Sequence, residues 1–245
     1  NKEANPDVAG TLNRTIDTVN ALPQAPAFAI HTGDVTHLSK ASEFDTASQL
    51  LSRLKVSEMH VVPGEHDVTD GQGTEFFARF GKASNNKGYY SFDANGVHFV
   101  ALVNVMNFKP NGLGALGDDQ LAWLTDDLAG RSASQPVVVF AHMPLWTIYE
   151  PWGWGTGEGE QIAALLRRFG SVTVLNGHIH QIVQKVEGNI LFHTARSTAY
   201  PQPQAGSGPG PGPLVVPPAQ LPGMLGVSVA VRRGKKLSLT DSILA

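Results

Sequence analysis

The stretch VTVLNGHIH, residues 172–180, decides the fold because it joins a buried strand to two closely spaced histidines. Residues 172–175 form an apolar run, which is typical of a strand covered on both faces. Asn176 and Gly177 end this run, and His178 and His180 follow at once. A buried strand that ends in imidazoles at a glycine turn predicts a site at the carboxyl end of a sheet strand.

Three further apolar runs end in the same way. Residues 27–32 end at Gly33-Asp34, residues 59–62 at Glu65-His66-Asp67, and residues 137–140 at His142. The carboxyl ends of strands in an open α/β sheet face a common crevice. We therefore expect all four polar segments to meet at one edge. Imidazole together with carboxylate suits Zn, Fe, Mn or Co.

The elements around these strands predict an α/β fold with two stacked mixed β-sheets flanked by helices. Apolar residues at helical spacing indicate helices at 8–22, 44–54, 121–128 and 162–169, while residues 182–186, 190–193, 225–231 and 236–239 favour a run of antiparallel strands. Residues 201–223 are crowded with Pro and Gly and predict an irregular loop. We expect residues 1–245 to form a single domain with this loop inside it.

Composition excludes several other classes of function. The 245 residues contain no Cys, so a metal must be held by His and carboxylate. The net charge of −3 with no basic stripe argues against binding a nucleic-acid polymer. No apolar run approaches the roughly 18 residues needed to span a bilayer, so no transmembrane segment is expected. The oligomeric state has no signature in the sequence.

The order of these segments resembles the calcineurin-like metallophosphoesterase superfamily, whose pattern is D-x-H, G-D, G-N-H-[DE], a single His and G-H-x-H. The resemblance implies hydrolysis of phosphate mono- or diesters through a metal-bound hydroxide at two divalent or mixed-valence ions (Mn, Fe or Zn). It implies that Asp34 bridges both ions, that Glu65, His142 and His178 complete the coordination of one ion, and that His180 binds the other. It also implies two catalytic roles: His66 is the acid that protonates the leaving oxygen, and Asp67 orients His66.

Two departures from the family pattern stand out. The chain contains no D-x-H, and a helix precedes the first strand, so we expect a strand carrying that motif upstream of Asn1. Glu65 replaces the usual Asn, and the added negative charge favours iron or manganese over zinc. A resemblance to the leader-bearing branch of the superfamily implies a periplasmic or secreted protein, and the absence of Cys is equally compatible with the cytoplasm as the alternative.

Several residues are candidates for a second shell or for substrate contact. They are His37, three residues after Asp34; Arg196, after a strand; and an aromatic wall containing Trp152 and Trp154, for which a packed surface loop is the alternative. His31, His60, His98 and His193 lie within apolar strands and are expected to be hydrogen-bonded rather than metal ligands. The predicted substrate is a small-molecule or lipid phosphate ester. A non-catalytic scaffold or metal-binding protein with the same fold is the alternative function.

The segment from Gly112 to Gly117 matches G-x-G-x-x-G but does not predict a dinucleotide site. Asp118 and Asp119 follow it directly and would repel a pyrophosphate. Asp118 is instead predicted to be the N-cap of the helix that follows.

Overall fold

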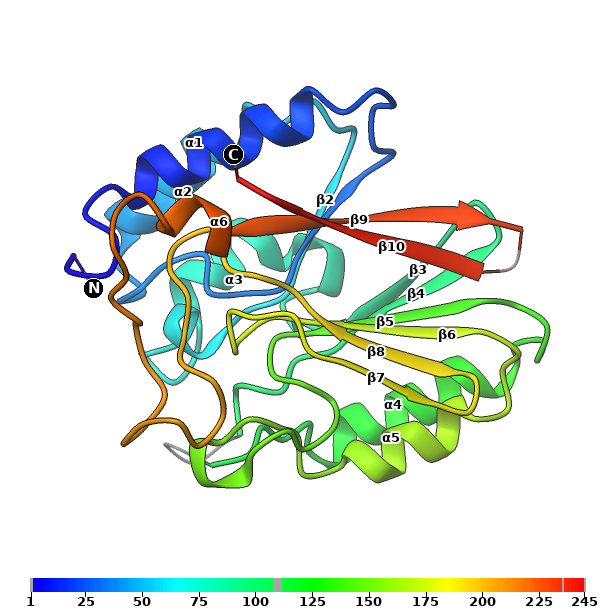
Figure 1. Cartoon of the computed structure of the whole chain (residues 1–245). Helices are drawn as coiled ribbons and strands as arrows, with labels where there is room; N and C mark the ends of the chain where they lie inside the picture. Colours follow the sequence, from blue (N-terminus) through cyan, green and yellow to red (C-terminus); the bar gives the residue numbers. More distant parts are fainter. Residues whose placement is uncertain (1, 108–111, 235, 245) are drawn as a thin grey trace.

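A six-stranded mixed sheet forms the centre of the molecule (Figure 1). The computed structural model describes residues 2–107, 112–234 and 236–244. The strand order is β3 (Tyr90–Ala94), β4 (Val97–Ala101), β5 (Val137–Ala141), β6 (Val172–Asn176), β8 (Ile190–Thr194) and β7 (Gln184–Glu187). Strands β4, β5, β6 and β8 are parallel, and β3 and β7 are antiparallel edges.

Helices cover one face of this sheet. These are α4 (Asp118–Ala129) and α5 (Gly159–Leu166) (Figure 1). Leu124 of α4 and Ile162 of α5 pack against Val139 of β5 in the largest apolar cluster. Each such side chain is almost fully buried, and its burial contributes about 1.5–3 kcal/mol.

Two pairs of strands contribute to the apolar layer on the other face. They are β1 (Ala29–His31) with β2 (Met59–Val61), which are parallel, and β9 (Gly226–Arg233) with β10 (Lys236–Ile243), which are antiparallel. Ile30 and Leu237 pack against a cluster that contains Phe140 of β5. Outside β1 and β2 lie α1 (Val8–Asn20), α2 (Ala41–Leu51) and α3 (Thr74–Phe80), and the short α6 (Leu221–Met224) precedes β9 (Figure 1). The predicted α/β sandwich is therefore confirmed.

The predicted elements differ from the structure in two details. Strand β8 pairs antiparallel with β7, as expected, but it also pairs parallel with β6, so the end of the central sheet is not purely a meander. Helix α4 has Gly117 at its N-cap, and Asp118 is its first residue. The Asp118 carboxylate thus acts on the exposed amides of the first turn as a charge rather than as the cap.

The parallel strands explain where the polar segments meet. The register runs in the same direction in β1 and β2 and again in β5 and β6, so each pair of strands ends at the same edge. The predicted loop at 201–223 crosses this edge after β8, and its last residues, 221–223, are helical because they belong to α6 (Figure 1). No helix in the described part of the chain is long and apolar enough to cross a membrane.

Candidate metal centre

Two histidines and two carboxylates converge at the shared strand edge. The Glu65 carboxylate lies between two imidazoles, with Oε2 2.8 Å from His142 Nε2 and Oε1 3.0 Å from His178 Nδ1. The Asp34 Oδ2 atom is 3.3 Å from the same His142 Nε2. Ligand atoms of Glu65, His142 and His178 all lie within 4.8 Å of one another. The structure therefore brings together the residues that the sequence predicted for one metal.

Charge complementarity holds this cluster together. Burial by itself would lower the pKa of His142, but the carboxylates of Asp34 and Glu65 raise it well above its usual value. Burial would raise the pKa of Glu65, but His178 and His142 hold it well below its usual value. In the metal-free protein a proton on the imidazole thus supplies the positive charge that these carboxylates require. Buried carboxylates facing imidazole nitrogens, in a chain without cysteine, fit a divalent cation.

A second group of three candidate metal ligands shares Glu65 with the first. Asp34, Glu65 and His66 each offer an atom, and these atoms lie within 4.8 Å of one another. The backbone amide of His66 donates to Asp34 Oδ1 over 3.0 Å. Glu65 is therefore the residue common to both groups, and Asp34 is connected to the first group by its 3.3 Å contact with His142.

Backbone carbonyls orient three of the histidine rings. Each accepts a hydrogen bond from Nδ1: His142 bonds to Thr32 O (2.6 Å), His180 to Tyr200 O (2.7 Å) and His66 to His37 O (3.0 Å). A ring whose Nδ1–H is engaged in this way presents its Nε2 lone pair to a ligand when neutral. In all three rings Nδ1 is therefore the nitrogen engaged by the backbone, and Nε2 is the nitrogen free of backbone contacts.

The turns that carry these groups need unusual backbone conformations. Asp34, His178 and His180 all have positive φ, at 55°, 67° and 55°. Non-glycine residues in this region cost about 1–3 kcal/mol and cluster at functional sites. Gly64 has no room for a side chain, because a Cβ there would meet Asp34 Oδ1 at 2.0 Å. Glycine therefore allows the Glu65 turn to approach the Asp34 turn.

Asp67 does not orient His66, contrary to the prediction. Its carboxylate is fully buried and accepts hydrogen bonds from the amides of Val35, Thr36 and Gly64 at 2.8–3.0 Å. It also accepts from the Thr36 hydroxyl over 2.9 Å. Burial and the charge of Asp34 raise the pKa of Asp67 to about 6. Asp67 thus ties the Asp34 turn to the Glu65 turn, and its effect on the site is indirect.

His180 lies beside the cluster but outside both groups of three in the described residues. Its ring is buried against Tyr200, with 4.7 Å between ring centres. Burial lowers the pKa of His180 to about 4, although the charge of Asp34 opposes this. The His180 imidazole is therefore neutral near pH 7, whereas the carboxylates beside His142 favour its protonated form.

Two other predicted site residues, His37 and Arg196, differ in how close they lie to the candidate metal ligands. The His37 ring lies 4.8 Å from the His66 ring, so the structure brings the two together. Burial and the His66 charge lower the pKa of His37. Arg196 donates to the carbonyl of Gly223 and so ties down the end of the loop.

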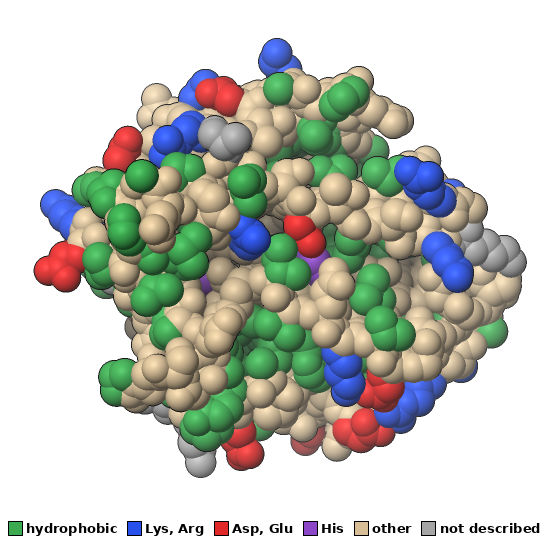
Figure 2. All heavy atoms as spheres, viewed as in Figure 1, with side chains coloured by type: hydrophobic (Ala, Val, Ile, Leu, Met, Phe, Trp, Pro, Cys, Tyr) green, Lys and Arg blue, Asp and Glu red, His purple; other side chains and the backbone are tan. Residues whose placement is uncertain are grey.

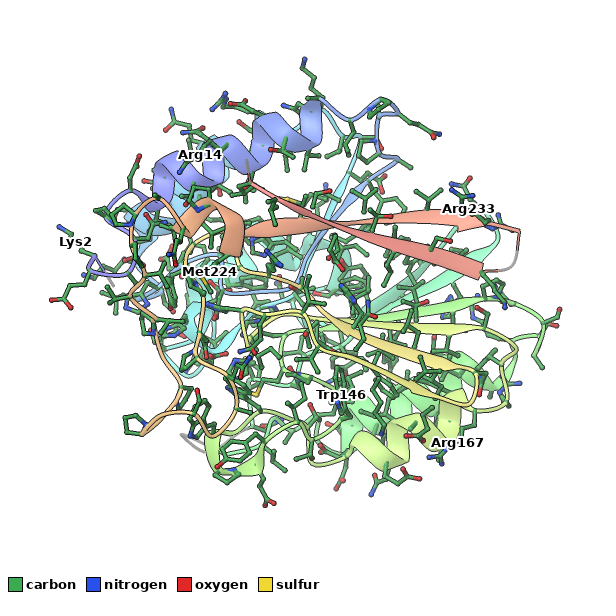
Figure 3. All side chains as sticks on the ribbon, in the orientation of Figure 1. Lys2, Arg14, Trp146, Arg167, Met224 and Arg233 are labelled. Carbon is green, nitrogen blue, oxygen red and sulfur yellow. The ribbon has the colours of Figure 1, made fainter. Side chains whose placement is uncertain are left out.

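The tryptophans form a buried cluster rather than an exposed wall. Trp152 is only 7% exposed to solvent, and Trp154 is 1% exposed. They pack around Ile179, the residue between His178 and His180, and therefore support the histidine turn from behind. Trp146 lies next to β8, with its ring centre 5.0 Å from that of Phe192 (Figure 3).

The four strand histidines have hydrogen-bonded partners, as predicted. His31 accepts from the Gly33 amide, His60 bonds to the Tyr90 hydroxyl, His98 to Asp93 and Asp127, and His193 to Gln184, Ser228 and Asp241. None of them is among the candidate metal groups in the part of the chain that is described.

Two buried asparagines near His142, Asn176 and Asn104, were not predicted as site residues from the sequence. Asn176 donates to Ala141 O and Met143 O, and Asn104 donates to Met143 O and to the Thr156 hydroxyl. They hold the backbone on both sides of His142. Their positions in the sequence could have indicated them, because Asn176 ends a buried strand and Asn104 follows one, and the candidate ligands also lie at strand ends.

Comparison with known proteins identifies the class. Residues 6–182 match the family described as calcineurin-like phosphoesterase, so the chain belongs to this family. It is accordingly a metal-dependent phosphoesterase, a hydrolase of phosphoric esters. Because the match covers most of the chain and includes every candidate ligand, the resemblance predicted from the motifs is confirmed.

Relatives are phosphodiesterases and phosphatases. The chain is 25% identical to a probable glycerophosphodiester phosphodiesterase GpdQ of Arcobacter nitrofigilis, over 79% of this chain and 71% of that protein. It is 26% identical to a probable cyclic nucleotide phosphodiesterase of Rhodopseudomonas palustris, with the same coverage of 79% and 71%. It is 25% identical to the serine/threonine-protein phosphatase CPPED1 of Danio rerio, over 69% of this chain and 58% of that protein.

Solved structures share the fold. A dimetal phosphatase from Danio rerio superposes with a TM-score of 0.66 at 17% identity, covering 78% of each chain. The purple acid phosphatase PPD1 from yellow lupin superposes with a TM-score of 0.60 at 15% identity, covering 76% of this chain and 39% of that one. At such identities the likeness supports the fold alone.

Proposed function

We propose that this protein hydrolyses small-molecule phosphate esters, and phosphodiesters first of all, at a binuclear metal centre. The observation that carries the proposal is the Glu65 carboxylate held between His142 and His178, with Asp34 on the same His142 nitrogen. Asp34, Glu65, His142 and His178 would hold one cation, and Asp34 and His180 would contribute to the other. When bound, two such cations activate water and neutralise the charge on phosphate oxygens.

His66 is proposed to act at the leaving oxygen. Its Nδ1 is engaged by the carbonyl of His37, so Nε2 is the nitrogen that is free to face substrate. Its amide is bonded to Asp34, which keeps the ring beside the metal ligands. With Nδ1–H donated to His37, only the imidazolium form of His66 carries a proton on Nε2, and this proton would pass to the departing alkoxide or stabilise the charge that develops there.

The preference for diesters rests on the relatives. Two relatives that each align with 79% of this chain have names that specify diester substrates, a glycerophosphodiester and a cyclic nucleotide. Lysine and arginine are scattered over the face drawn in Figure 2, with no continuous basic patch there. This distribution suits a small-molecule or lipid phosphate ester better than a nucleic-acid polymer.

The metal is proposed to be manganese or iron. The Glu65 carboxylate adds a full negative charge where the family pattern has a neutral amide. Hard cations bind carboxylate oxygen more strongly than they bind a neutral donor. Zinc remains the competing metal, and affinity measurements with each ion distinguish them.

Hydrolysis assays test the proposal. Intact protein loaded with Mn²⁺, Zn²⁺ or Fe²⁺ should hydrolyse bis-p-nitrophenyl phosphate faster than p-nitrophenyl phosphate. A faster reaction with the monoester would overturn the diester preference and retain the phosphoesterase. No hydrolysis of either compound by intact, metal-loaded protein would contradict catalysis and favour the scaffold alternative.

A further inference from the structure

The histidine turn is held from outside by one segment of the Pro/Gly-rich loop. Residues 200–203 lie against residues 178–181, which follow β6. Three hydrogen bonds connect them: Gln202 Nε2 donates to His178 O (2.9 Å), His180 Nδ1 to Tyr200 O (2.7 Å), and Gln181 Nε2 to Pro203 O (3.0 Å). The loop is therefore fixed to the backbone and side chains of the turn itself.

This support matters because the turn is strained. His178 and His180 both have positive φ, which side chains other than glycine rarely adopt. Such conformations persist when surrounding contacts fix them. Ile179 is fully buried among Trp152 and Trp154 and fixes the turn from the inside. The loop segment fixes its outer side.

Gln202 is the side chain that makes the direct backbone contact from the loop. Its Nε2 donates to the carbonyl of His178, while its Oε1 is buried without a hydrogen-bond partner among the described residues. This contact fixes the orientation of the Gln202 amide, because a flipped amide would place its Oε1 against the carbonyl oxygen of His178. A buried acceptor left unpaired is costly. The contact with His178 is accordingly the bond that this amide makes.

We propose that Gln202 is a positioning residue for metal ligation by the His178–His180 turn. By holding the carbonyl of His178, Gln202 fixes the peptide that orients the His178 ring toward Glu65, and Tyr200, two residues earlier, fixes the ring of His180. Gln202 is thus the side chain through which the loop at 201–223 acts on the backbone of the turn. The inference rests on the proposed function, since it assumes that the cluster binds metal.

Metal affinity tests the proposal without reference to catalysis. The variants are Gln202→Ala, Gln202→Met, which keeps the side-chain volume but has no donor, and the control Gln204→Ala. Gln204 is exposed in the same loop, two residues further along. Mn²⁺ titration by calorimetry should show affinity lower by about tenfold in both Gln202 variants, the scale typical for partners of metal ligands. Gln204→Ala should bind Mn²⁺ like the wild type.

A spectrum and a melting curve separate positioning from stability. The visible absorption of Co²⁺-loaded protein reports ligand geometry, and it should change in both Gln202 variants but not in Gln204→Ala. The melting temperature of metal-free Gln202→Met should match that of the control, which excludes a general loss of fold. Unchanged affinity and an unchanged spectrum in Gln202→Met would overturn the proposal.

The outcomes also separate this proposal from the proposed function. A wild-type protein that binds Mn²⁺ tightly but hydrolyses no ester would contradict the function, and the Gln202 comparison would still decide the positioning role. A wild-type protein that binds none of these ions would overturn both.

Discussion

The two sides of the candidate centre are built differently. On the Glu65 side, the carboxylates of Asp34 and Glu65 lie 2.8–3.3 Å from imidazole nitrogens of His142 and His178. On the His180 side, a neutral ring is held by a backbone carbonyl of the loop. The Glu65 side is thus organised by electrostatic contacts between residues at the sheet edge. The His180 side instead depends on the loop region to fix the orientation of the His180 ring.

Removing His142 should have the largest effect on activity. His142→Ala deletes the imidazole that contacts both carboxylates and leaves two buried anions without it. We expect kcat/KM for bis-p-nitrophenyl phosphate to fall by about a thousandfold or more, near 4 kcal/mol, together with loss of bound metal. His60→Gln, in β2 and stacked on Phe92, is the matched control. Retained activity in His142→Ala would remove the Glu65 side from the mechanism.

Removing Asp67 should mainly affect stability. Asp67→Ala breaks the hydrogen bonds that connect two ligand turns, and we expect the free energy of unfolding of the metal-free protein to fall by about 3 kcal/mol. Urea denaturation measures this, with the exposed Asp126→Ala as a control that should change little. A large loss of activity with unchanged stability would instead support a direct catalytic role.

Proton release on metal binding should differ between the two sides. Because the carboxylates raise the pKa of His142 despite its burial, metal must displace a proton there, and affinity should rise up to tenfold per pH unit until that pKa is passed. His180, with its pKa lowered to about 4, is already neutral near pH 7 and should release none.

Calorimetry in buffers of different ionisation enthalpy measures that release. His180→Ala should release as many protons as the wild type when each binds Mn²⁺, because the proton is lost from His142. A smaller proton release in His180→Ala than in the wild type would mean that the two sides do not differ in charge.

Replacing Glu65 should produce the smallest change. Glu65→Asn restores the amide of the family pattern and removes one negative charge between His142 and His178. We expect Mn²⁺ affinity to fall by about tenfold relative to Zn²⁺, since the lost carboxylate favours the harder ion. Metal analysis after equilibrium with both ions measures the ratio. Unchanged metal content and an unchanged rate would show that Glu65 does not select the metal.

The sequence was sufficient to predict that the candidate ligands of the Glu65 side lie together. Asp34, Glu65, His142 and His178 each follow an apolar strand at or near a sharp turn, and parallel strands of known direction leave such residues at one edge. The role of Asp67 was wrong because adjacency in sequence does not give side-chain direction. Glu65–Asp67 forms a 3₁₀ turn, in which neighbouring side chains point roughly 120° apart, so Asp67 points away from His66.

The sequence by itself determined the fold, the family and the gathering of polar residues at the strand ends, because these depend on hydrophobic periodicity and on short motifs. Only the tertiary structure decided which carbonyl orients each histidine, where Asp67 points, that the tryptophans are buried, and that Gln202 reaches His178. Those contacts join segments that are up to 110 residues apart, as between His142 and Thr32. No local pattern encodes them, because packing of the sheets brings the partners together only once the chain has folded.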